Sequence, residues 1–135
     1  MAAVGLLPAG ARAAVALAVG VTDNPSDGMA DGYSYNYKSE SEARHDALEQ
    51  CRAFKTASKA ARNCHLIGGL KKGCLAIAFD PDKDSSGMGW ALAEKREDAE
   101  SKAVENCREA APRGRQKFCN IDTLKCDGDA SPKKQ

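Results

Sequence analysis

The sequence contains the same pattern of apolar, glycine and cysteine residues twice. The order of the pattern is kept while its spacing drifts slightly, as expected when small insertions fall in loops. Two copies are too few for a solenoid, so we expect one compact domain with approximate internal two-fold symmetry. Function is then to be sought on the surface, especially where the copies differ. The matched positions are Leu17 and Leu75, Gly32 and Gly89, and Cys51 and Cys107, separated by 58, 57 and 56 residues.

Each copy is expected to begin with a strand that is buried on both faces. Residues 15–21 alternate large aliphatic side chains with alanine or glycine, and residues 74–79 alternate large apolar side chains with cysteine or alanine. A period of two is typical of a β-strand, and a face of small side chains lets a covering layer approach closely. Polar turns then lead into returning strands at 32–38 and 89–94.

A helix and a third strand complete each copy. Ser39 is expected to cap the first helix, with Glu42 completing a capping box, and an apolar stripe leads to Cys51. A basic loop follows each helix and ends at a further cysteine, Cys64 or Cys119, which begins a short strand. The predicted fold class is therefore α+β: two pseudo-symmetric β-β-α-β units form one domain, an antiparallel sheet covered by two helices.

The ends of the chain differ from this domain in composition. An apolar run near the start is followed by Ala11-Arg12-Ala13, which has the small-x-small form of a signal-peptidase site. No other stretch approaches the length of a membrane span, so we expect that the protein does not cross a membrane. The expected boundaries are a signal-peptide remnant at 1–13, a single domain at 14–126 with repeats at 14–73 and 74–126, and a polar, disordered tail at 127–135.

Six cysteines in 135 residues exceed what a reducing cytosol usually permits. They lack the paired short spacings of a structural zinc site, so the sequence predicts three disulfides and a secreted or periplasmic location. Fifteen pairings are possible, and equivalence between the copies favours one local bridge in each. The favoured pairs are Cys51 with Cys64, Cys107 with Cys119, and Cys74 with Cys126, the last joining the two copies; the main alternative pairs Cys51 with Cys107 across the pseudo-axis.

These features together resemble a family of secreted bacterial proteins known only as domain of unknown function four-one-eight-nine. The resemblance rests on the strands Leu17-Ala-Val-Gly and Cys74-Leu-Ala-Ile-Ala, the pairs Gly32-Tyr33 and Gly89-Trp90, the alanine-rich helices ending in cysteine and the final Cys126. It covers nearly all of 14–126. This chain departs from the pattern because its first strand has no initial cysteine and its inter-cysteine loops are longer and basic. The resemblance implies export and disulfides, and no activity.

Residue types that carry catalysis are scarce. The two histidines, His45 and His65, have no counterpart in the other copy. His45 is expected to be a solvated helix side chain and His65 a strand-edge residue; alternatively, one of them is the base of a small hydrolase working with a carboxylate. Phosphate-binding and nucleophile motifs are absent, so no cofactor is expected. Asp80, Asp82 and Asp84 are a weak metal candidate: Ser85 and Ala91 break the EF-hand register, which leaves a non-EF calcium site or ordinary turn chemistry.

Binding residues are sought among aromatic and basic side chains. Every second residue from Tyr33 to Tyr37 is a tyrosine, so Tyr33, Tyr35 and Tyr37 are expected on the same face of a strand. There they either form an aromatic platform for a partner or are covered by a helix. The inter-cysteine loops are basic, and they form one basic patch if the pseudo-symmetry brings them together; otherwise they are ordinary solvated surface. The basic residues of these loops are Arg52, Lys55, Lys59 and Arg62 in the first copy and Arg108, Arg113, Arg115 and Lys117 in the second.

The net charge of the chain limits the kinds of partner that it can bind. The twenty basic and nineteen acidic side chains nearly cancel, which argues against nucleic acid as a binding partner. The sequence therefore predicts a non-enzymatic secreted or periplasmic binding protein, an inhibitor-like or immunity-like partner of another envelope or secreted protein, or a ligand of an anionic envelope component. The alternatives are the small hydrolase and a structural envelope protein. The oligomeric state is not predicted.

Overall fold

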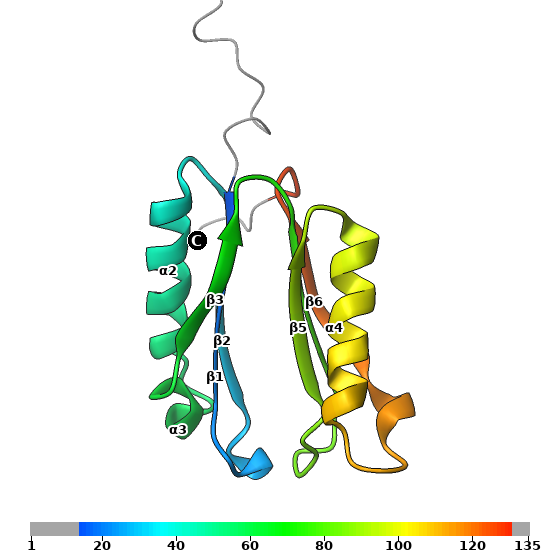
Figure 1. Ribbon diagram of the computed structural model, residues 1–135. Coiled ribbons are helices and arrows are strands. Elements are labelled where there is room, and N and C mark those ends of the chain that lie inside the picture. The colour runs from blue at the N-terminus through cyan, green and yellow to red at the C-terminus, as the bar shows by residue number, and fades with distance from the viewer. Residues whose placement is uncertain (1–13, 131–135) are drawn as a thin grey trace, which may run out of the picture.

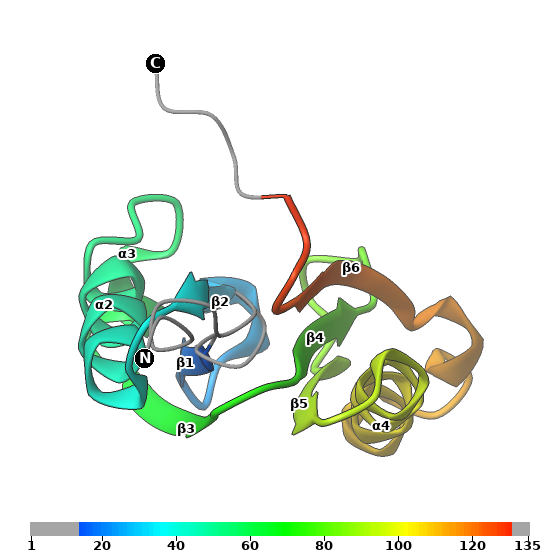
Figure 2. The ribbon, with the colours of Figure 1, turned by 90° about the horizontal axis from the view of Figure 1, so that it is seen from above.

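The computed structural model describes residues 14–130, which form two units with one antiparallel three-stranded sheet each. The expected signal-peptide remnant and residues 131–135 of the expected tail lie outside the described residues. Figure 1 shows the two sheets side by side, with α2 on the outer side of one and α4 on the outer side of the other. Seen from above, the molecule has four layers: helix, sheet, sheet, helix (Figure 2). The predicted fold class is confirmed, with the antiparallel strands divided between two sheets.

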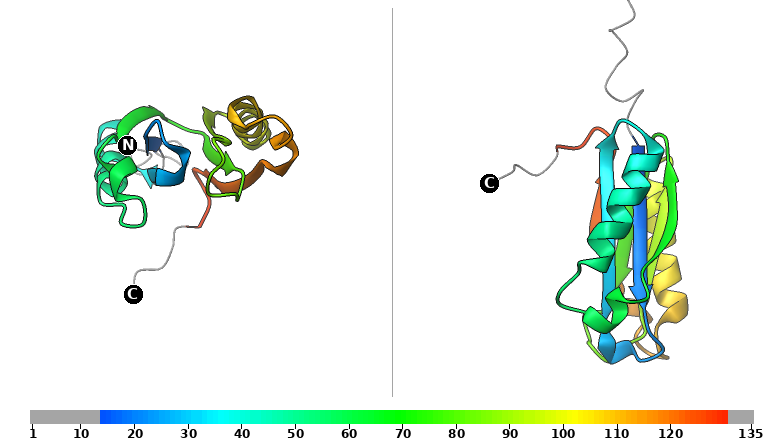
Figure 3. Two further views of the ribbon diagram at one scale, coloured as in Figure 1. Left: turned by 90° about the horizontal axis from the view of Figure 1, so that it is seen from below. Right: turned by 90° about the vertical axis from the view of Figure 1, so that its left-hand side faces the viewer.

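The units have the same order of elements. In each sheet the first strand of the unit lies in the centre, giving the orders β2-β1-β3 and β5-β4-β6. Figure 3 shows α2 lying along the outer face of the first sheet. The first unit contains β1 (Ala14–Val21), η2 (Pro25–Asp27), β2 (Met29–Tyr37), α2 (Glu40–Arg52), α3 (Ser58–Ala61) and β3 (His65–Leu70); the second contains β4 (Cys74–Phe79), β5 (Met88–Ala93), α4 (Arg96–Ala110), η3 (Gln116–Phe118) and β6 (Asn120–Cys126).

The two faces of each central strand have different partners. On β1 the alanine face packs against α2, and β4 packs against α4 in the same way. The faces with large side chains meet between the sheets and are withdrawn from water there. The predicted alternation of small and large faces is thus confirmed, and each face has its own covering layer. The cluster between the sheets consists of Val15, Leu17, Val19, Met29, Tyr35, Leu75 and Ile77.

Local signals in the sequence account for the start of α2 and for the closeness of the helices. The Ser39 hydroxyl accepts a hydrogen bond of 3.1 Å from the backbone N–H of Glu42, as the capping box predicts. Both helices lie directly against a glycine of the returning strand. A methyl group added at Gly32 would overlap the Ala47 carbonyl oxygen, and one at Gly89 would overlap the backbone N–H of Cys107.

These glycines correct the alignment of the first strands. Ala18 pairs with Gly32 and Ala78 pairs with Gly89, so Ala18 and Ala78 occupy equivalent places, whereas matching Leu17 with Leu75 pairs Ala18 with Ala76. The first strands are therefore shifted by two residues from the alignment expected from the sequence. A shift of two keeps every side chain on its face, so the apolar pattern alone does not reveal it.

The three predicted disulfides are present, and the role expected for one of them is wrong. Cys51–Cys64 and Cys107–Cys119 close equivalent local loops. Cys74–Cys126 does not join the two copies: the residues are directly opposed on β4 and β6 of the second sheet. The position in the first sheet that is equivalent to Cys74 is Ala14, so the first sheet has no cysteine at this place.

The segment after β6 ties the two units together. The Asp127 carboxylate accepts hydrogen bonds from the backbone N–H groups of Asn36, at 2.8 Å, and Gly73, at 3.1 Å. The Asn36 side chain donates to the Asp129 carbonyl oxygen and accepts from the Gly128 N–H. This differs from the expected disorder for Asp127 to Ala130, because the segment is held by the end of β2 and by the connection between the sheets.

The close helix approach makes a stability prediction. Gly32→Ala and Gly89→Ala are each expected to lower the free energy of unfolding by about 3 kcal/mol, because the added methyl group meets backbone that cannot rotate away. Urea unfolding of the oxidised protein measures the loss. Gly68→Ala is the control, since its methyl group would meet only the end of the Leu92 side chain, at 3.3 Å. Equal stability of all three variants would contradict the described packing.

Candidate functional site

The two histidines lie on the surface in different parts of the first unit. The His45 side chain is 73% exposed, and its Nε2 lies 3.4 Å from an oxygen of Glu49, which is 62% exposed. His65 begins β3, is exposed, and has Nδ1 3.4 Å from the Asn63 carbonyl oxygen. Water competes for both contacts, so neither histidine is held in the shielded geometry that general-base catalysis requires.

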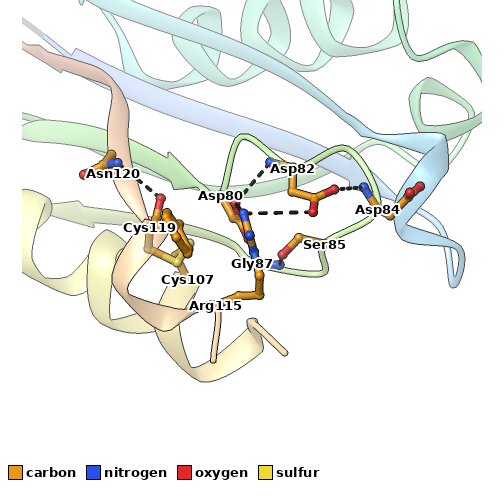
Figure 4. Close-up of polar contacts among 10 residues, drawn as sticks. Asp80, Asp82, Asp84, Ser85, Gly87, Cys107, Arg115, Cys119 and Asn120 are labelled. Atoms are coloured by element: carbon orange, nitrogen blue, oxygen red, sulfur yellow. Dashed lines mark hydrogen bonds and ion pairs between the residues drawn. A yellow bond between two sulfur atoms is a disulfide. The ribbon is translucent and has the colours of Figure 1, made fainter. Parts of the chain in front are cut away.

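The candidate metal ligand Asp80 forms an ion pair with an arginine. Arg115 forms two hydrogen bonds to the Asp80 carboxylate, at 2.7 Å from Nε and 2.6 Å from Nη2, and the Asp80 side chain is buried (Figure 4). The guanidinium holds the pKa of Asp80 well below its usual range. An oxygen of Asp82 accepts from the Asp84 N–H instead of facing a common centre. Within residues 14–130, no group of three or more acidic, histidine or cysteine side chains is arranged to hold a metal.

The same ion pair changes the role expected for Arg115. It fastens the Cys107–Cys119 loop to the end of β4, so Arg115 is not available to a partner. In the first unit the equivalent contact is made without charge: α3 lies against Gly20, where an added methyl group would overlap the Ala60 carbonyl oxygen. The two inter-cysteine loops are therefore docked at the same place by different chemistry.

The three tyrosines do not share one face, contrary to expectation. Tyr33 and Tyr35 pack into the cluster between the sheets, with ring centroids 6.4 Å apart, whereas Tyr37 packs on the helix side and donates a hydrogen bond to Asp46. The pairing of β1 with β2 shifts at this point, and Asn36 has a positive φ of 67°. A helix therefore covers only Tyr37; the second sheet covers the other two.

The basic loops do not come together into one patch. Figures 1 and 2 place α3 and η3 on opposite outer sides of the molecule, with both sheets between them. In the first loop, Arg52, Lys55 and Arg62 line one open hollow of about 620 Å³, and Lys59 is not part of its lining. Arg108, Arg113 and Lys117 of the second loop are exposed.

The basic hollow, defined as the depression lined by Arg52, Lys55 and Arg62, also has apolar lining. Partly buried Phe54 and buried Ala61 contribute to it. Among the described residues, the three cations form no ion pair with an acidic side chain. The hollow therefore offers positive charge that the chain itself does not neutralise.

A polar seam that the sequence analysis did not identify runs between the edge strands β2 and β6. Burial, and secondarily the charge of Asp122, raises the pKa of Asp31 to about 6. The same surroundings raise the pKa of Tyr33, first through burial and then through the charge of Asp31. The Lys125 ammonium lies 5.9 Å from the centre of the Tyr35 ring. Asp31 is therefore partly buried beside aromatic rings, and the exposed Asp122 is near enough for its charge to act on Asp31.

The equivalent seam on the other edge is apolar. Asp31 corresponds to Met88, since each precedes the glycine that its helix covers. Asp122 corresponds to Ile67, since both lie where the pairing of the third strand shifts. A comparison of the two copies at these positions shows carboxylates in one seam and apolar side chains in the other. That comparison requires the strand register, which the sequence alone does not provide.

The seam predicts a pH-dependent stability. The pKa of Asp31 is higher in the folded protein than in the unfolded chain, so its contribution to folding is present below about pH 4 and is lost as the pH rises through about 6. Because Asp31 is only partly buried, the loss is about 1–2 kcal/mol. Urea unfolding as a function of pH should show that Asp31→Asn removes this loss and that Asp122→Asn reduces it. An unchanged pH profile in Asp31→Asn would exclude the effect.

Comparison with known proteins gives a family match for this chain. Among the described residues, no helix is long and apolar enough to span a membrane. No curated protein and no solved structure matches the chain. Residues 13–126 match the family described as Domain of unknown function (DUF4189), and because the match covers most of the chain, the protein belongs to that family.

Proposed function

We propose that this protein is a secreted or periplasmic, non-enzymatic binding protein, and that its basic hollow recognises an acidic surface on another envelope or secreted protein. The observation that carries the proposal is the set of three cations around an open depression with no acidic partner among the described residues. Three disulfides and a helix-covered sandwich suit a protein that works outside the cytosol.

The hollow is suited to binding because its scaffold does not depend on its charges. Cys51–Cys64 closes the loop, and α3 is docked on Gly20 through close backbone contact. A loop fixed in this way loses little conformational entropy when a partner binds. Phe54 and Ala61 add apolar area beside the cations, which favours a protein surface over a simple inorganic anion.

The difference between the two copies supports placing the site in the first unit. Arg115 of the second loop is paired with buried Asp80, whereas the cations of the first loop point to open solvent. A charge that is already paired internally gives little attraction to a partner. The first loop therefore keeps four exposed cations against three in the second loop, and three of its four line one hollow.

Paired substitutions test the proposal with a control that the chain itself provides. Arg52→Gln/Arg62→Gln is expected to weaken binding to a glutamate-rich peptide about 10-fold at low salt, because two unneutralised cations are removed. Arg108→Gln/Lys117→Gln removes the same charge from corresponding places of the other loop and should leave affinity nearly unchanged. Calorimetry or fluorescence anisotropy at several salt concentrations measures both.

A pull-down experiment with the same first-loop and second-loop variants tests for native partners. Oxidised wild-type protein and the second-loop variant should recover the same protein from an envelope or secreted fraction, and the first-loop variant should lose it. Equal losses in both variants would show that net charge alone matters and would contradict the hollow as the site. Binding to vesicles of anionic lipid without binding to the peptide would contradict a protein partner and would indicate that the hollow binds an anionic envelope surface.

A further inference from the structure

A small pocket lies where the turns of the two units meet, at the end of the sandwich away from the Asp127 contacts. Both turns lie at this end in Figure 1. The pocket has a volume of about 170 Å³, and its apolar walls come from both units. Its full lining is Val21, Thr22, Asp23, Pro25, Gly28, Ser86, Met88 and Trp90.

Some polar side chains that line the pocket already have hydrogen-bond partners among the described residues, and one does not. The Thr22 hydroxyl donates to the Asp27 carboxylate at 2.7 Å and accepts from the Asn24 N–H. The Ser86 hydroxyl donates to the Ala110 carbonyl oxygen at 2.5 Å. The Asp23 carboxylate has no hydrogen bond or ion pair within residues 14–130, and it is exposed at the rim. It is therefore the one lining group in this part of the chain with charge left for a ligand.

The surrounding turns strengthen this negative charge. Asp27 lies in the first turn, and Asp82 and Asp84 lie in the second, with Lys83 between them. Asp80 contributes little, since Arg115 neutralises it. Carboxylates around an apolar pocket attract a ligand whose cationic group stays near the rim while its apolar body enters.

We infer that this inter-turn pocket binds a small organic cation of the alkylammonium class, with the ammonium between the Trp90 ring and Asp23 and its alkyl groups against Met88. An indole ring is the side chain that attracts organic cations most strongly, and an unpaired carboxylate provides the counter-charge. The volume suits a tetraalkylammonium or choline-sized group. This site is separate from the basic hollow and has the opposite charge.

The only tryptophan of the chain, Trp90, provides a direct readout. Titration with choline at constant ionic strength should change its fluorescence and shift its indole N–H resonance in a saturable way. The neutral isostere 3,3-dimethylbutanol has the same shape without the charge and should bind at least about 10-fold more weakly. Nα-acetyl-lysine N-methylamide, whose side-chain ammonium is free, tests whether a protein side chain can supply the same cation. Tighter binding of this probe than of choline would assign the pocket to a partner's lysine and overturn the small-ligand assignment.

Two isosteric variants separate the pocket from the general acidity of the turns. Asp23→Asn is expected to weaken choline binding at least about 5-fold, whereas Asp84→Asn removes the same charge outside the lining and should change it less than about 2-fold. Near-ultraviolet circular dichroism confirms that each variant is folded. Three results would each overturn the inference: equal affinity for choline and its neutral isostere, equal effects of the two variants, or no resonance shift at saturating probe.

Discussion

The packing of the two large-residue sheet faces against each other is the constraint on which the rest of the structure depends. A single unit would expose Val15, Leu17 and Val19 to water, and burying each such side chain contributes about 1.5–3 kcal/mol. The second unit covers this face with Leu75 and Ile77, so each copy completes the core of the other. Duplication therefore solves a packing problem, and the helices need only cover the small outer faces.

That arrangement explains how much could be predicted from the sequence. The alternation from Val15 to Val21 shows which side chains share a face, and the repeat selects the disulfide pairing, because both depend on positions near each other in the chain or related by the duplication. The strand register, the side of the sheet that Tyr37 takes and the partner of Arg115 could not be predicted. A two-residue shift leaves the apolar pattern unchanged, one bulge at Asn36 reverses a face, and an ion pair between residues 80 and 115 has no local signal.

The two copies differ most at their edges and loops. Core positions are constrained in both units by the same close contacts, as Gly32 and Gly89 show, so they remain similar. At the edges, Asp31 and Asp122 replace the apolar pair Met88 and Ile67 without loss of the fold. Edge positions tolerate such changes because solvent can still reach part of each side chain. Chemistry specific to one unit therefore collects at the rim of a symmetric interior.

The two inter-cysteine loops are docked in different ways, and this difference determines which cations remain without an internal ion pair. In the second unit, burial of Asp80 makes its pairing with Arg115 obligatory, because an isolated buried carboxylate is strongly unfavourable. In the first unit, Gly20 and the Ala60 carbonyl oxygen meet in the corresponding place, and the loop is docked by steric fit and a disulfide. The cations of that loop form no ion pair among residues 14–130. Substitution of these cations leaves no buried charge without a partner, which lets this surface adapt to a binding partner while the scaffold stays the same.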